Sequence, residues 1–142
     1  MATGGAVESG DVDGIAAKSL PGWPRWLLRV SSTLALAMLF DQAVFAGQFL
    51  SGNYPALEVH RENATLAGVS VLIAVVAAVL AFRPGGGPWW PILAYLGLFG
   101  LIATQIVLGF TRALAFHIPL GVAIILLAAA MCAWTWRGQW RA

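Results

Sequence analysis

The sequence predicts an all-α integral membrane protein, an antiparallel bundle of four helices with both termini in the cytoplasm. Of its 142 residues, 60% are hydrophobic and only 10% are charged, whereas soluble domains carry roughly 25% charged residues. The apolar residues form four runs of helix length, and turn-forming residues lie between the runs. This length suits one small helical domain.

Four segments are long enough to cross a bilayer, whose hydrocarbon core of about 30 Å takes roughly 20 apolar helical residues. Backbone polar groups in lipid must bond within their own segment, so these runs are expected to be helices. The connection 51–55 has turn chemistry, 83–88 holds three glycines and two prolines, and the last connection is very short. The spans are expected at about 26–50, 57–82, 89–110 and 113–136.

Residues 1–22 differ from the rest of the chain, which is expected to form the bundle over 23–142. They hold five glycines and four charged residues, with no apolar run of helix length. Such a composition predicts a flexible cytoplasmic tail. It lacks the basic start and apolar stretch of a signal peptide.

The distribution of basic residues predicts the orientation in the membrane. One side of the spans carries Lys18, Arg25, Arg29, Arg83, Arg137 and Arg141, and the other carries Arg61 and Arg112. Six against two places both termini in the cytoplasm. The seven tryptophans all fall on the cytoplasmic side, where indole rings anchor at the interface. We expect a multi-pass protein of the cell membrane, with the bacterial inner membrane as the first choice.

The only two histidines, His60 and His117, open spans two and four, which run in the same direction. His60 precedes Arg83 by 23 residues and His117 precedes Arg137 by 20. The difference of three residues is about 4.5 Å of helix, which a modest tilt absorbs. Both imidazoles are therefore expected at one depth near the outer face. Ionisable residues within spans are costly and mark functional sites.

A metal shared by the two histidines explains the match, and haem b is the favoured cofactor. Inward histidines on two helices form a site type known in helical bundles, and imidazole is the usual haem ligand. The two outer arginines, Arg61 and Arg112, lie near the histidines and suit the haem propionates. Small residues near the histidines, among them Ala64, Ala67, Gly68 and Gly121, leave room for a macrocycle or let helices pack closely.

Other interpretations stay open at this stage. His60 is also compatible with a polar interfacial stretch, His117 with a helix-packing hydrogen bond, and both arginines with simple span ends. Zinc is less favoured because a structural site needs four protein ligands, and only Asp41, Glu58 and Glu62 could supplement the pair. The single cysteine, Cys132, excludes an internal disulfide and a paired-cysteine metal site, and no basic run suggests nucleic acid.

Further polar residues lie within the predicted spans. Asp41 is expected either to accept a proton linked to redox change or to hydrogen-bond across helices, for example to Gln105. Gln48 could help line the same pocket. Thr104 and Gln105 are expected to make interhelical hydrogen bonds.

Three short motifs resemble one half of the haem A synthase family. They are Glu58-Val59-His60-Arg61, the run from Gln105 to Arg112, and His117 at the start of span four. That family has two four-helix halves, each with histidine ligands on its second and fourth helices. The likeness covers about residues 26–136 and implies an outward-side haem held by His60 and His117, with Glu58 near the first ligand. The chain is a single half, without the paired loop cysteines of some members, and has one histidine in span four where the family often has two.

Three functions follow as hypotheses. The first is a bis-histidine haem b membrane protein that transfers single electrons, with a quinol or another redox membrane protein as partner. The second is a haem-modifying enzyme or subunit related to haem A synthase. The third is a cofactor-free accessory subunit or small transporter. The sequence is compatible with a monomer or an oligomer, and it leaves open whether the protein is an enzyme.

Overall fold

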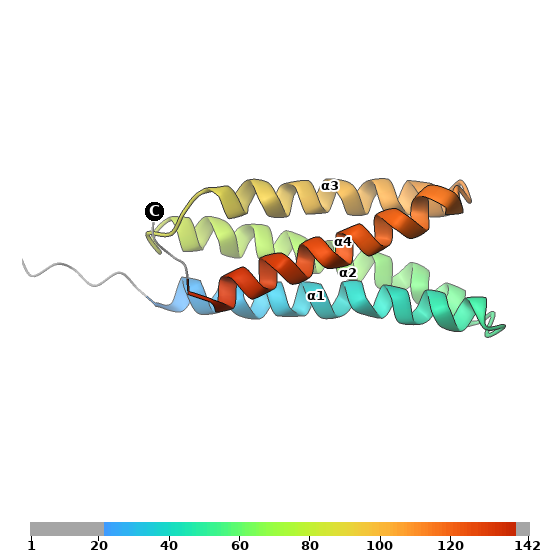
Figure 1. Ribbon diagram of the computed structural model, residues 1–142. Coiled ribbons are helices and arrows are strands. Elements are labelled where there is room, and N and C mark those ends of the chain that lie inside the picture. The colour runs from blue at the N-terminus through green and yellow to red at the C-terminus, as the bar shows by residue number, and fades with distance from the viewer. Residues whose placement is uncertain (1–21, 139–142) are drawn as a thin grey trace, which may run out of the picture.

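The computed structural model describes residues 22–138, which form four helices and, within that range, no strand (Figure 1). The predicted tail, apart from Gly22, and residues 139–142 lie outside the described residues. Each helix agrees with its predicted span to within three residues, so the all-α prediction is confirmed. The helices are α1 (Trp23–Leu50), α2 (Ala56–Phe82), α3 (Trp90–Phe110) and α4 (Leu114–Trp136).

All four helices are long and apolar enough to cross a membrane. The shortest, α3, has 21 residues, which is about 32 Å of helix at 1.5 Å per residue. This length matches a hydrocarbon core of about 30 Å. The chain therefore carries four candidate transmembrane helices, as expected of a multi-pass membrane protein.

The helices form a closed antiparallel ring in which each packs against its two neighbours in the order α1, α2, α3, α4 and back to α1. Within residues 22–138 the diagonal pairs α1/α3 and α2/α4 make no backbone contact. We call the end with the α1–α2 and α3–α4 connections, residues 40–62 and 103–123, the histidine end. The opposite end, with the first residues of α1 and the last of α4, is the terminal end.

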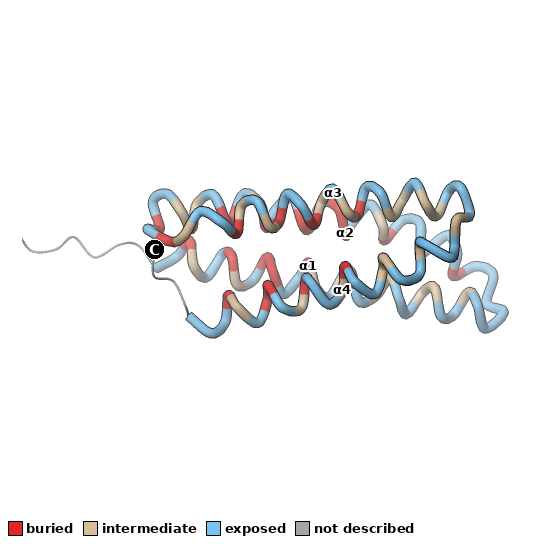
Figure 2. Tube along the Cα trace, turned by 45° about the horizontal axis from the view of Figure 1, so that its top comes forward, coloured by how far each residue is buried: buried red, intermediate tan, exposed pale blue. Residues whose placement is uncertain are grey.

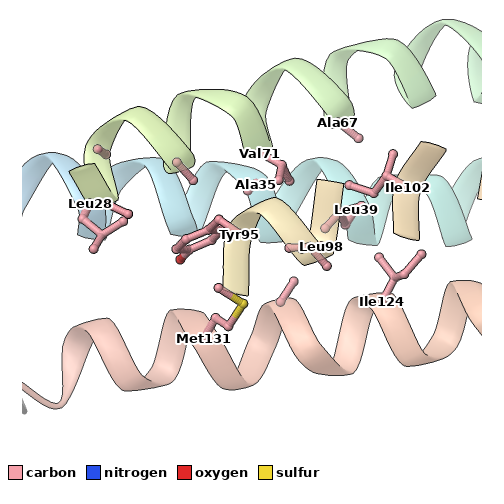
Figure 3. Close-up of a cluster of buried hydrophobic side chains, with 14 of the residues drawn as sticks. Leu28, Ala35, Leu39, Ala67, Val71, Tyr95, Leu98, Ile102, Ile124 and Met131 are labelled. Carbon is pink, nitrogen blue, oxygen red and sulfur yellow. The ribbon is translucent and has the colours of Figure 1, made fainter. Parts of the chain in front are cut away.

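The bundle is packed most tightly toward the terminal end (Figure 2). Leu28, Val71 and Leu98 are fully buried, and together with Met131 of α4 they bring side chains of all four helices into one core (Figure 3). Alanines line the inner face of α2 and let neighbouring helices approach closely. At the histidine end, in contrast, Ala56 is the one buried residue among those described.

Polar and aromatic contacts close α1 against α4 at the terminal end. The guanidinium of Arg29 lies against the rings of Trp26 and Trp136, 5.1 and 5.4 Å from their centroids, and the two rings contact each other edge to face. Its Nε donates to the Thr135 carbonyl oxygen at 3.1 Å, and the Trp136 indole donates to the Thr33 hydroxyl. All described tryptophans lie at this end, which leaves the histidine end free of indole rings.

Candidate cofactor site at the histidine end

The two histidine rings lie side by side inside the histidine end. Their centroids are 6.3 Å apart and their planes are inclined by 64°. His60 is the fifth residue of α2 and His117 the fourth of α4, so diagonal helices bring them together across the bundle. Both side chains are half-buried. Counting residues along the spans therefore placed the two imidazoles correctly relative to one another.

Each histidine is locked to a glutamine on the preceding helix by two reciprocal hydrogen bonds. The Nδ1 of His60 lies 3.1 Å from the backbone carbonyl oxygen of Gln42, and the Gln42 side-chain amide donates to the backbone carbonyl oxygen of His60 at 3.1 Å. The Nδ1 of His117 lies 3.0 Å from the backbone carbonyl oxygen of Gln105, and the Gln105 side-chain amide donates to the backbone carbonyl oxygen of His117 at 2.8 Å.

These bonds decide which ring nitrogen of each neutral imidazole carries the proton. A carbonyl oxygen only accepts, so Nδ1 must be the protonated, donating nitrogen in both rings. The lone pair of each Nε2 is then free to accept a hydrogen bond or to bind a metal. Metal-ligating histidines are held in this way, with the other ring nitrogen donating to a carbonyl or carboxylate.

The α1–α2 and α3–α4 hairpins repeat one another around this site. Buried residues lie three, seven and fourteen positions before each glutamine: Leu39, Ala35 and Leu28 in α1, and Ile102, Leu98 and Pro91 in α3. Others lie seven, eleven, fourteen and eighteen positions after each histidine: Ala67, Val71, Ala74 and Ala78 in α2, and Ile124, Ala128, Met131 and Thr135 in α4. The histidine pair therefore sits where two equivalent hairpins face each other.

Two glycines make the second hairpin's arrangement sterically possible. A Cβ on Gly109 would lie 3.1 Å from Cε1 of the His117 ring, and one on Gly121 would lie 2.8 Å from Nε2 of Gln105. The space beside Gly121 is thus taken by the glutamine amide, because this amide must reach the His117 carbonyl. Ala67 and Gly68 lie in the packed core. The small residues near the histidines therefore serve helix packing and the glutamine contact.

The donor set suits a metal that takes two ligands from the protein. Two imidazoles bound to opposite sides of one metal, each by a bond of about 2.0 Å, have ring centroids roughly 6 Å apart, and the centroids of His60 and His117 are 6.3 Å apart. Among residues 22–138, no three histidine, cysteine, aspartate or glutamate side chains gather as metal ligands. In the described part of the chain, Asp41, Glu58 and Glu62 therefore do not gather with the two histidines.

Arg61 and Arg112 both belong to the histidine end. Arg61 follows His60 and makes a loose ion pair with Glu58 at 3.8 Å, both side chains being exposed. Its guanidinium lies 5.5 Å from the ring centroid of Phe110, the last residue of α3. Arg112 follows two residues later in the α3–α4 connection. Both cations are thus available at the histidine end for an anionic group.

Arg112 has an unusual backbone conformation. Its φ of 58° is the one positive value at a non-glycine residue in the described part of the chain. The Ala113 amide donates to the Leu108 carbonyl and the Arg112 amide to the Gly109 carbonyl, which is the Schellman ending of a helix. The end of α1 has the same pattern with Gly52, φ 97°, in the equivalent place.

Other polar residues behave differently from the sequence-based expectations. Gln105 bonds to His117 and not to Asp41, and its Oε1 is buried without a partner. Asp41 is half-buried, and Gln48 is exposed. The interhelical hydrogen bond expected of Gln105 is confirmed, whereas its pairing with His117 and the matching role of Gln42 were missed. A signal existed, since each glutamine lies on the helix before a histidine, close to the same depth.

Comparisons with protein-family models, with curated proteins and with solved structures gave no match. The resemblance to one half of the haem A synthase family therefore rests on the short motifs around His60, Gln105 and His117.

Proposed function

We propose that this protein is a membrane haem b protein that transfers single electrons, with His60 and His117 as the two axial ligands. The observation that carries the proposal is the matched geometry of the two imidazoles. Both rings hold their Nδ1 against a glutamine carbonyl, and their centroids are 6.3 Å apart. Each ring is then protonated at Nδ1, which is the tautomer that a ligand histidine needs, and its Nε2 lone pair is left for the metal.

The surrounding residues suit this group. Arg61 and Arg112 supply cations for two propionates at the edge of the span. The one cysteine, Cys132, lies near the terminal end of α4, far along the helix from His117, so the cofactor would be held without a thioether bond. Bound haem b supplies reversible one-electron chemistry at its iron.

Electron transfer is favoured over oxygen binding because both axial positions would be taken by histidine. No coordination position of the iron would then remain vacant for a small ligand such as oxygen. The histidines lie within the first five residues of their helices, close to the edge of the apolar span. Such a position suits exchange with a quinol or a redox protein at that membrane surface, which we propose to be the outer surface of the bacterial inner membrane.

The optical spectrum of the purified protein, oxidised and reduced, tests this function. We expect a sharp low-spin haem b spectrum that is lost in both His60→Ala and His117→Ala, because each variant removes one of two ligands. Thr104→Ala is the matched control, since Thr104 is exposed, adjoins Gln105 and donates its hydroxyl to the Gly100 carbonyl oxygen of its own helix. Full haem content in both histidine variants would rule out the ligand assignment.

A cofactor-free bundle is the second candidate, and one observation favours it. Both imidazoles already have a hydrogen-bond partner, so interhelical packing alone accounts for one nitrogen of each ring. This alternative predicts colourless protein that takes up no haem when haem is added. A haem-modifying activity would show instead as a change in the mass of the extracted haem after incubation with oxygen and a reductant.

A further inference from the structure

We propose that Gln42 and Gln105 are positioning residues that set the planes of the two histidine rings, and that they hold the rings in a crossed orientation. The inference rests on the proposed function, since it concerns the electronic state of an iron held between the rings. It adds a property that the ligand assignment alone does not give, because two histidines can bind one metal at any relative angle.

The hydrogen bonds restrict the rotation of each ring. The second side-chain torsion of histidine is broad, so the ring plane is weakly determined by the side chain itself. Here the Nδ1–H of each ring points at a carbonyl oxygen on the neighbouring helix, at 3.1 Å for His60 and 3.0 Å for His117. A ring held at Nδ1 as well as at Cβ has little freedom to rotate.

The glutamine side chains make that restraint rigid. The backbone carbonyl of each glutamine accepts from the histidine ring. The side-chain amide of the same glutamine donates to the backbone carbonyl of that histidine, at 3.1 Å for Gln42 and 2.8 Å for Gln105. The two bonds fix the register of α1 on α2 and of α3 on α4 at the ligand. Without the amide, the helices could slide or separate there, because the histidine end has little buried packing of its own.

The ring planes are inclined by 64°, closer to perpendicular than to parallel. Each imidazole donates π-electron density to the iron d orbital that its plane selects. Parallel rings raise one of the two relevant orbitals, whereas crossed rings raise both and leave them nearly equal in energy. Near-equal orbitals give a strongly anisotropic low-spin ferric signal, with one dominant feature at a high g value and no resolved three-line pattern.

Electron paramagnetic resonance of the oxidised haem-bound protein tests the proposal. The wild type is expected to give the high-g signal. Gln42→Met and Gln105→Met keep the side-chain length but lose the donor, and their signals are expected to broaden and shift toward the three-line type while haem content is retained. The exposed glutamine at the same end supplies the matched control, Gln48→Met, which is expected to leave the signal unchanged.

Two further variants separate positioning from a general loss of structure. Gly121→Ala places a Cβ 2.8 Å from the Gln105 amide nitrogen and should reproduce the effect of Gln105→Met from the opposite helix. Gln42→Glu keeps a donor only while its carboxyl is protonated. Its signal should return to the wild-type form at low pH and depart from it as the pH rises.

The outcomes distinguish this inference from the proposed function. Wild-type protein that binds no haem overturns the function. Wild-type protein that binds haem through both histidines but gives the three-line signal overturns the crossed geometry. Glutamine variants with the unchanged wild-type signal overturn the positioning role, while the haem function stands.

Discussion

At the scale of single residues, Arg112 occupies a position that glycine fills elsewhere in the same protein. Gly52 and Gly138 end α1 and α4 with positive φ, and Arg112 ends α3 in the same way. An L-residue in the left-handed region costs about 1–2 kcal/mol relative to its usual conformation. Backbone strain of this kind concentrates at functional sites, which agrees with a role for the Arg112 guanidinium in holding an anionic group.

Arg112→Gly is expected to stabilise the cofactor-free protein and to weaken haem binding. The substitution relieves the strained backbone but removes one of the two arginines at the histidine end, so the two effects have opposite signs. Thermal unfolding in detergent measures the first, with a gain of about 1 kcal/mol, and haem titration measures the second. Arg112→Lys, which keeps both charge and strain, is the control. Unchanged haem affinity in Arg112→Gly would remove Arg112 from the site.

Residue counting identified the histidines because they are rare and lie in apolar spans, where an ionisable group stands out. Gln42 and Gln105 were not identified as their partners, since an amide in a span is commonly a packing contact and the bonds involve backbone carbonyls. The positive φ of Arg112 was equally unpredictable, because turn preferences at that position point to glycine. Local sequence thus indicates which side chains are chemically unusual but gives little about the contacts that orient them.

At the scale of helices, Gly109 and Gly100 on α3 have opposite surroundings. A Cβ on Gly109 would meet the His117 ring at 3.1 Å, whereas one on Gly100 would meet no atom within 4 Å. Glycine in a helix interior is less favourable than alanine by about 1 kcal/mol. Gly100 is therefore a helix position with no steric requirement for glycine, and Gly109 is a contact between α3 and α4.

Gly109→Ala is expected to lower the thermal midpoint of the protein, and Gly100→Ala to raise it. In the first variant the His117 ring must move away from the Gln105 carbonyl, and the loss of that contact outweighs the gain in helix propensity. In the second, only the gain in propensity acts. Thermal unfolding of both variants in one detergent makes the comparison. A rise in both would show that the ring tolerates the methyl group without losing its hydrogen bond.

Helix positions followed from hydropathy and length, because an apolar run in lipid has few alternatives to a helix. The bounds differ from the predicted ones by three residues at most. Which face of each helix turns inward was harder to obtain, since apolar residues surround all four helices and the pattern has no clear polar side. Small residues were the best guide, and alanines do line the inner face of α2.

At the scale of the whole molecule, packing and candidate chemistry occupy different ends. The buried core lies toward the terminal end, where Arg29 and the tryptophans close α1 against α4. The histidines lie at the opposite end, among residues that are only half-buried. Substitutions at the site should therefore leave most of the core packing intact, which makes the variants above informative about binding.

The orientation of the molecule in the membrane is testable with single cysteines in a Cys132→Ser background. Gly22→Cys at the terminal end and Asn53→Cys in the α1–α2 connection both lie at exposed positions. The excess of arginine at the terminal end predicts that end in the cytoplasm. A membrane-impermeant thiol reagent added to intact cells, or to spheroplasts, should label only Asn53→Cys, and Gly22→Cys should react after permeabilisation. The reverse pattern would contradict the predicted topology.

The pairing of each histidine with a glutamine of its own hairpin has a consequence for biogenesis. Gln42 and His60 are 18 residues apart, and Gln105 and His117 only 12. Each ring therefore finds its hydrogen-bonding carbonyl one connection away, as soon as two consecutive helices have been inserted. A nascent chain can prepare the first imidazole before the second hairpin has left the ribosome, so that the meeting of the two halves brings together rings that are already oriented.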